Sequence, residues 1–238
     1  FSGEKLKLIG VTLDGKKLEA PAFLLTDHEL TIPAPPTSQF ILEIETECDP
    51  AGNTALSGLY QSNGVFCTQC EAEGFRRITY FYDRPDVMTR YTVRMEADKA
   101  SCPVLLSNGN CGETGAIAGT GRHFAVWHDP HPKPSYLFAL VAGELAGVHD
   151  SFTTMSGRKV QLGIYVEKGK EDRCAWAMES LKASMRWDET AFGREYDLEV
   201  FNIVAVSDFN MVAMENKGLN VFNDKYVLAD PQTATDVD

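Results

Sequence analysis

The sequence is poor in cysteine and carries no glycosylation signal. Its six cysteines are scattered over 238 residues, which is too sparse for a small domain held together by disulfides. None of its nine asparagines begins an Asn-x-Ser or Asn-x-Thr acceptor site. Both absences favour a reducing compartment, and we expect the protein to be cytoplasmic.

The chain also lacks long apolar runs and an excess of basic residues. No segment approaches the roughly 20 apolar residues that cross a bilayer, so we expect no membrane partner. Acidic residues outnumber basic ones by 34 to 22, a net charge of −12, which disfavours nucleic acid as a partner. The chain starts at Phe1 without a signal-peptide layout, and we expect it to be a piece of a longer protein.

Several catalytic motifs are missing as well. A zinc-protease helix needs His-Glu-x-x-His, and the pair His28-Glu29 has no second histidine after it. His128 and His131 stand three apart, but Pro130 between them excludes a regular helix. There is no Gly-x-Ser-x-Gly elbow and no phosphate-binding loop. These residues therefore predict no zinc site and no activated nucleophile in this chain.

One Cys-x-x-Cys pair, Cys67 and Cys70, leaves two interpretations open. It is either a redox pair or half of a zinc site, or it is two buried or loosely paired thiols. No second pair follows, and its flanks do not resemble a strand leading into a redox helix. The structural interpretation is therefore the favoured one.

Short alternating segments with frequent turn signals dominate the chain up to about residue 148, and an apolar content of 44% can supply a buried core. We expect a mainly β sandwich or saddle there. Three prolines at 130, 132 and 134 predict a stiff link into an apolar strand at residues 136–141. Further strands are expected at residues 5–9, 40–45 and 91–95.

From about residue 146 onward, the sequence pattern instead predicts a strand, a helix and another strand. Asp172 can cap a helix, and Gly193 is placed where a C-cap glycine would stand. A buried strand is expected at residues 199–206. We therefore predict two domains, residues 1–145 and residues 146–238. The apolar positions expected to face the core from the helix are Cys174, Met178, Leu181, Met185 and Phe192.

A polar segment at residues 207–220 follows that strand, and composition alone would make it a loop with a solvated glutamate. It contains Val212-Ala213-Met214-Glu215-Asn216 and continues to residue 223. This run resembles the Gly-Ala-Met-Glu-Asn exopeptidase motif of the zinc metallo-aminopeptidases, the aminopeptidase N family. Residues 66–87 are similar to the N-terminal domain of the bacterial-type enzymes, whose pattern apicomplexan parasites share. Segments at 121–123, 132–143 and 176–188 resemble that subfamily too.

The resemblance implies a fold and a cofactor. The family has a β-saddle N-terminal domain followed by an α+β, thermolysin-like catalytic domain, of which this chain would hold the opening sheet and helix. The zinc-binding helix lies downstream of the exopeptidase motif. We therefore expect zinc in the full-length parent, no metal ligand and no catalytic residue in this chain, and the remaining C-terminal part of the same protein as a partner.

The resemblance also implies an activity, the release of single residues from peptides with a free N-terminus. Glu215 and Glu71 would hold the substrate α-ammonium by charge-assisted hydrogen bonds. Gln69 would line the pocket, or serve equally well as a structural hydrogen-bond partner, and Met211 would cushion the first side chain. Backbone groups near Val212 would pair with the peptide. The expected substrate-binding residues are Gln69, Glu71, Met211, Val212, Ala213, Met214, Glu215 and Asn216.

Val212 departs from the family motif, which has glycine there. A positive φ at this position would strain valine, whereas an extended φ would leave it unstrained but narrow the substrate channel. Either case makes a catalytically impaired, peptide-end-binding protein an alternative function. A third alternative, set apart from the resemblance, is a β-rich interaction module with a thiol pair.

Overall fold

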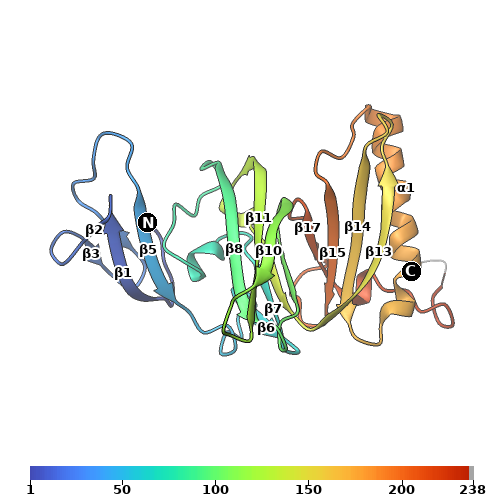
Figure 1. Ribbon diagram of the computed structural model, residues 1–238, viewed down its shortest axis with the longest axis horizontal. Coiled ribbons are helices and arrows are strands. Elements are labelled where there is room, and N and C mark those ends of the chain that lie inside the picture. Colours follow the sequence, from blue (N-terminus) through green and yellow to red (C-terminus); the bar gives the residue numbers. More distant parts are fainter. Residues whose placement is uncertain (236–238) are drawn as a thin grey trace. The chain divides into compact units, whose positions relative to one another are not determined.

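The computed structural model describes residues 1–235, and they form two compact units, each described here by itself. The first unit holds Phe1–Gln61, Thr68–Thr89 and Lys133–Phe138, and the second holds Ser62–Cys67, Arg90–Pro132 and Ala139 onward. The chain passes between them within the hairpin of β6 (Gly58–Ser62) and β7 (Val65–Gln69). Strands dominate and the described residues contain a single α-helix, which confirms the mainly β prediction (Figure 1).

The first unit is built on an antiparallel sheet in the order β2-β1-β5. Val11 of β1 lies opposite Ile44 of β5, and Val11 is buried with Leu30 and Tyr80 in a small core. The alternation of exposed and more buried residues along β5 is the period that the sequence predicts for a half-buried strand. The strands are β1 (Lys7–Leu13), β2 (Lys16–Lys17), β3 (Leu24–Leu25), β4 (Leu30–Thr31) and β5 (Leu42–Glu47), and 3₁₀ turns span Phe75–Arg77 and Ser135–Leu137.

The second unit contains a three-stranded sheet in the order β10-β11-β8. It also contains β12, which pairs with β7 on one side and with β9 on the other. Pro130 and Pro132 lie inside β11, so the prediction of a stiff proline link is wrong for these two. β10 pairs with β11 only as far as His128, so on that side of β11 the missing proline N–H groups leave no ladder bond unmade. The strands are β8 (Thr89–Asp98), β9 (Val104–Ser107), β10 (Asn110–Ala116), β11 (Arg122–Lys133) and β12 (Leu140–Gly143).

The predicted strand at residues 136–141 is also wrong in its first half. The 3₁₀ turn Ser135–Leu137 occupies that half, and the strand β12 starts only at Leu140. The Ser135 hydroxyl donates to Asp83 Oδ1 over 2.6 Å, and both residues are buried. A long-range bond of this kind outweighs the apolar pattern that suggested an extended strand.

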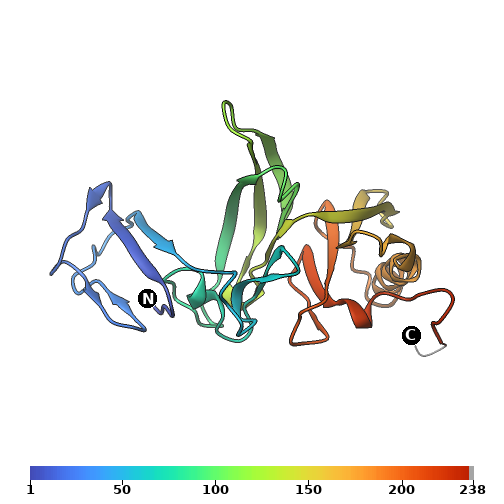
Figure 2. The same ribbon diagram turned by 90° about the horizontal axis from the view of Figure 1, so that it is seen from below.

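A five-stranded mixed sheet in the order β13-β14-β15-β17-β16 completes the second unit. β14, β15 and β17 run parallel, and the two outer pairs are antiparallel. The helix α1 lies along one face of this sheet (Figure 1) and is seen nearly end-on in Figure 2. The elements are β13 (Leu145–Thr153), β14 (Lys159–Glu167), α1 (Ala175–Phe192), β15 (Val200–Val206), β16 (Ala213–Met214) and β17 (Leu219–Asn223), with 3₁₀ turns at Glu171–Arg173 and Asp224–Tyr226.

The helix α1 differs from its prediction at its N-terminus and at one predicted core position. Asp172 lies in the 3₁₀ turn before the helix, and Cys174 is the N-cap, without a side-chain cap. Gly193 ends the helix with φ 62, as predicted. Phe192 is 62% exposed, so its predicted core position is wrong. Glu189 is the buried residue of the last turns instead.

The core between α1 and the sheet explains why the other predicted helix positions are buried. Side chains from α1 pack on apolar residues of β13, β14 and β15. None of the described helices is long and apolar enough to cross a membrane. The buried members from α1 and its N-cap are Cys174, Ala177, Met178, Leu181 and Met185. The domain boundary predicted at residues 145 and 146 stays a prediction, and the five-stranded sheet begins at Leu145.

Candidate substrate-binding site

The motif that resembles an exopeptidase signature lies at an edge of the five-stranded sheet. β16 is the outermost strand there, with Ala213 opposite Phe222 and Met214 opposite Val221. The Asn223 N–H donates to the Val212 carbonyl over 3.0 Å, which extends the pairing by one residue. An outermost strand has backbone groups on its outer side that no further strand of the sheet takes up.

Side-chain burial alternates along this edge. Met214 is 2% exposed, Glu215 is exposed, and Asn216 is 1% exposed. The alternation follows from extended backbone, in which successive side chains point to opposite sides. The carboxylate of Glu215 is therefore presented outward between two anchored neighbours.

A tight turn follows Glu215. The Leu219 N–H donates to the Asn216 carbonyl over 2.8 Å, and Gly218 has φ 85, the geometry that favours glycine at the third position of a type II turn. The Asn216 side chain donates to the Met214 carbonyl over 3.3 Å. Asn216 thus serves the turn itself, a structural use alongside the substrate contact that the resemblance implied.

Val212 has an unstrained backbone. The described non-glycine residues with positive φ do not include it, and its side chain is 56% exposed. The strained alternative raised by the sequence is therefore wrong. Met211, beside it, is 42% exposed, so it does not belong to the core. Narrowing of a substrate channel by Val212 stays a prediction.

Charged groups flank the turn. Lys217 Nζ lies 2.8 Å from Asp197 Oδ1, and His131 Nε2 lies 3.3 Å from Asp197 Oδ2. Burial tends to raise the pKa of Asp197, but the hydrogen bond and charge of Lys217, with a further effect of His131, hold it below its ordinary value. Sequence reasoning missed Asp197, because nothing in its neighbourhood along the chain marks it.

The remaining two predicted site residues belong to the first unit. Gln69 is the last residue of β7 and is 1% exposed, and Glu71, two residues later, is exposed. The Glu71–Ala72 peptide bond is cis. A side chain at Gly74 would place its Cβ 2.5 Å from the Gln69 carbonyl oxygen. The loop after β7 therefore folds back closely on the strand end.

Asp83 holds this loop from inside the first unit. Its carboxylate is 3% exposed and accepts the Arg76 N–H and Nε–H over 3.1 Å and 3.0 Å, as well as the Ser135 hydroxyl. Several donors on one buried carboxylate make a fixed support. The segment that carries Glu71 thus ends in an ordered turn.

The two thiols of the Cys-x-x-Cys pair lie in the interior of the protein. Cys67 and Cys70 are at most 1% exposed, and burial, with the nearby Asp83 charge, raises the pKa of Cys70. Redox and metal-binding cysteines require the opposite shift, toward the thiolate. The structure therefore favours two structural thiols over a redox pair.

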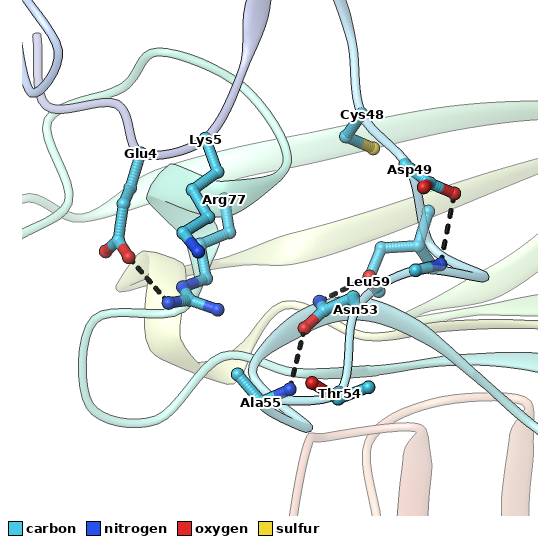
Figure 3. Close-up of a pocket in the computed structure, with 10 residues that line it drawn as sticks. Glu4, Lys5, Cys48, Asp49, Asn53, Thr54, Ala55, Leu59 and Arg77 are labelled. Carbon is cyan, nitrogen blue, oxygen red and sulfur yellow. Dashed lines mark hydrogen bonds and ion pairs between the residues drawn. The ribbon is translucent and has the colours of Figure 1, made fainter.

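A polar cavity of about 280 Å³ lies elsewhere in the first unit. In Figure 3 the Glu4 carboxylate points toward the Arg77 guanidinium, with which it forms an ion pair, and Asp49 accepts a backbone N–H. Burial, then Asp49, raises the pKa of Cys48 beside them. Glu4 and Arg77 therefore neutralise each other within the cavity wall, and the Asp49 carboxylate is engaged by the Gly52 N–H.

Residues 1–235 bring together no group of three or more His, Cys, Asp or Glu side chains that could hold a metal ion. The zinc ion that the resemblance implies therefore has no fitting site on the described residues. The six predicted site residues from 211 to 216 lie together in the second unit, and Gln69 and Glu71 lie together in the first.

The fold and the motif define a class: a β-rich module followed by the opening sheet of a peptidase catalytic domain. The Peptidase M1 N-terminal domain model matches residues 5–137, and the Peptidase family M1 domain model matches residues 176–238. The chain belongs to the peptidase M1 family.

Relatives support this assignment along the whole chain. Aminopeptidase N of Caulobacter vibrioides is 60% identical over 238 residues, and that of Escherichia coli is 55% identical over the same length. A crystal structure of Legionella pneumophila aminopeptidase A in complex with aspartic acid matches with a TM-score of 0.94 at 37% identity, over 99% of this chain and 28% of that one. The chain spans 27% of the length of both aminopeptidase N relatives.

Proposed function

We propose that this chain is the N-terminal part of a zinc-dependent aminopeptidase that releases single residues from peptides with a free N-terminus. The observation that carries the proposal is the exposed Glu215 carboxylate directly after the edge strand β16. Membership of the peptidase M1 family and the aminopeptidase names of the relatives support it.

Glu215 is suited to hold an α-ammonium. An ammonium group has three donors and a carboxylate only acceptors, so the pair forms strong, directional hydrogen bonds. In our proposal Glu71 supplies a second carboxylate, Gln69 lines the pocket and Met211 contacts the first side chain. Requiring a free ammonium limits cleavage to the first peptide bond.

The edge strand is suited to align the peptide backbone. An extended peptide can pair with the outer backbone groups of Val212, Ala213 and Met214, as peptides do when they add to a sheet edge. The exposed Val212 side chain would then lie beside the substrate backbone. Alignment by an edge strand is independent of the substrate's side chains.

The zinc ion and the residues that hold it belong, in this proposal, to the remaining part of the protein, which is therefore this chain's partner. No step on the present residues passes through the metal, because the described residues do not fit it. Placement in the cytoplasm stays a prediction.

The first test compares a free and a blocked substrate. The full-length protein with zinc should hydrolyse alanyl- or leucyl-amide fluorophores and leave their N-acetylated twins intact. Cleavage of both the free and the N-acetylated substrates would contradict an exopeptidase that requires a free α-ammonium. Cleavage of neither, with zinc bound, would contradict the proposed activity.

The second test concerns Glu215. Glu215→Gln should lower kcat/KM for the free substrate roughly 10- to 100-fold, the equivalent of losing a charged hydrogen bond of about 1.5–3 kcal/mol. Glu199→Gln is the matched control, because Glu199 is an exposed glutamate just before β15, outside the motif. Equal effects of the two variants would remove Glu215 from the site.

A non-catalytic peptide-end-binding protein is the second candidate, favoured by Val212 in place of the motif glycine. It predicts that neither substrate is hydrolysed and that peptides with a free N-terminus bind measurably. Val212→Gly would then be expected to restore hydrolysis. If Val212→Gly does not hydrolyse the free substrate either, peptide-end binding without catalysis is the remaining function.

A further inference from the structure

The loop between β9 and β10 lies against the turn that carries Glu215. Asn108 in this loop is 2% exposed, and its side chain bridges two backbones. Its Oδ1 accepts the Ala139 N–H over 2.7 Å, and its Nδ2 donates to the Lys217 carbonyl over 3.0 Å. The Asn108 amide thus links the turn to Ala139, the residue directly before β12.

The two backbones approach each other closely at this point. A Cβ on Gly218 would lie 2.9 Å from the Gly109 nitrogen, and both glycines have positive φ, 85 and 88. Such an approach is open to glycine and not to larger residues. Asn110, the first residue of β10, accepts the Glu199 N–H over 2.8 Å, so the residue after the loop also holds the chain just before β15.

The turn needs support from outside. β16 has two residues and only two paired positions with β17, so the sheet itself holds the following segment through few contacts. The Asn202 N–H donates to the Gly218 carbonyl over 3.1 Å from the sheet side. Lys217 and Asp197 form a half-exposed ion pair, and pairs of this kind contribute little. Asn108 is the buried side chain that reaches the turn from the opposite element.

We propose that Asn108 is a positioning residue, which fixes the direction of the Glu215 carboxylate by holding the Lys217 carbonyl. The inference rests on the proposed role of Glu215. Asparagine suits the task because one side of its amide accepts and the other donates. A residue with only one of these capacities leaves either Ala139 or Lys217 without its partner.

The test replaces the donor alone. Asn108→Asp keeps an acceptor for the Ala139 N–H and removes the donor to Lys217. In the full-length protein we expect kcat/KM for a free aminoacyl amide to fall on the order of 10- to 100-fold, mostly through KM, because an ammonium anchor is displaced. A loss of folded protein would instead lower kcat and leave KM unchanged.

Ser107→Ala is the matched control. Ser107 precedes Asn108, is fully buried, and donates to the Ala139 carbonyl over 2.7 Å without reaching the turn. We expect its KM to stay at the wild-type value. A KM that rises equally in both variants would overturn the proposal, because it would show a general effect of loosening the loop.

Gly218→Ala tests the same contact without placing a charge in the interior. It should raise KM in the same way, while Gly157→Ala should not, since Gly157 also has positive φ but open space around its Cβ position. If Asn108→Asp does not fold, these two variants decide. A folded Gly218→Ala protein with unchanged KM would overturn the proposal.

A double-mutant cycle separates positioning from independent effects. In a Glu215→Ala background, Asn108→Asp should change KM by less than twofold, because the group that it positions is gone. Full additivity would overturn the inference while leaving the role of Glu215 intact. If Glu215→Ala itself leaves KM and kcat unchanged, the proposed function of Glu215 fails first.

Discussion

At the scale of the residue, Glu215 is exposed because both of its neighbours are anchored. Met214 faces the interior, and Asn216 begins a turn whose hydrogen bonds close within four residues. A buried residue on each side leaves the carboxylate of Glu215 few directions. Preorganisation of this kind lowers the entropy lost when a ligand is bound.

Val212 provides a test of backbone strain at this scale. Because its φ is not positive and its side chain is 56% exposed, Val212→Gly should lower the free energy of unfolding by about 0.5–1 kcal/mol through the added freedom of the unfolded chain. Chemical denaturation of the full-length protein measures this change. Lys5→Gly is the contrasting control, since Lys5 has φ 52 and glycine relieves a left-handed conformation. A more stable Val212→Gly protein would contradict the unstrained backbone.

At the scale of the element, the parallel strands of the five-stranded sheet share a polar cluster at their carboxyl ends. Lys170 Nζ lies 3.0 Å from Glu167 and 2.7 Å from Asp224, and the Ser207 hydroxyl donates to Glu167 over 2.8 Å. Glu167 ends β14, Ser207 follows β15 and Asp224 follows β17. The cluster therefore ties together three strands that are distant in the sequence.

This cluster predicts acid sensitivity. Burial tends to raise the pKa of Glu167, but hydrogen bonds from Asn63, Lys170 and Ser207 outweigh it and hold the pKa below its ordinary value. A depressed pKa contributes stability above the unfolded-state value, and that stability is lost as the pH falls through the folded-state value. Glu167→Gln should therefore lower stability by about 1–2 kcal/mol at pH 7 and by less near pH 3.

The measurement is the thermal unfolding midpoint of the full-length protein across this pH range. Glu113→Gln is the control, because Glu113 is exposed on β10 in the same unit. A deficit of Glu167→Gln that is the same at pH 7 and pH 3 would rule out the ionised carboxylate as its cause.

At the scale of the whole molecule, the proposed function assigns substrate-binding groups to this chain and the metal centre to the remaining part of the protein. The predicted site residues fall on both compact units, and the described residues bring no three metal-binding side chains together. The chain also spans only 27% of the length of its aminopeptidase N relatives. Hydrolysis is therefore expected of the full-length protein.

Metal removal tests this division of roles. A chelator should abolish hydrolysis by the full-length protein, and added zinc should restore it, because zinc supplies the hydrolytic chemistry in this proposal. His28→Ala removes the histidine of the sequence's His-Glu pair and should leave the bound zinc unchanged, as measured by elemental analysis. A loss of zinc in this variant would show that the present chain contributes a ligand.

Local signals in the sequence predicted much of the fold. Gly193 marks the end of α1 because only a left-handed residue fits there, and the period of Met178, Leu181 and Met185 gives the buried face of the helix. Asp172 failed as a cap because a 3₁₀ turn precedes the helix. Pro130 failed as a linker because β11 continues through it to Lys133. The proline error concerns pairing with strands that are distant in the sequence, which no local pattern contains.

The sequence by itself determined the mainly β character, the family resemblance and the choice of Glu215 as a candidate site residue, since each depends on residues that are close together along the chain. Only the tertiary structure decided that Val212 is unstrained, that Cys70 is buried, and that the Asn108 side chain holds the turn after Glu215. Asn108 and Lys217 are 109 residues apart. Contacts of this kind exist only once packing has closed the chain between them, because their geometry is set by all the elements in that interval.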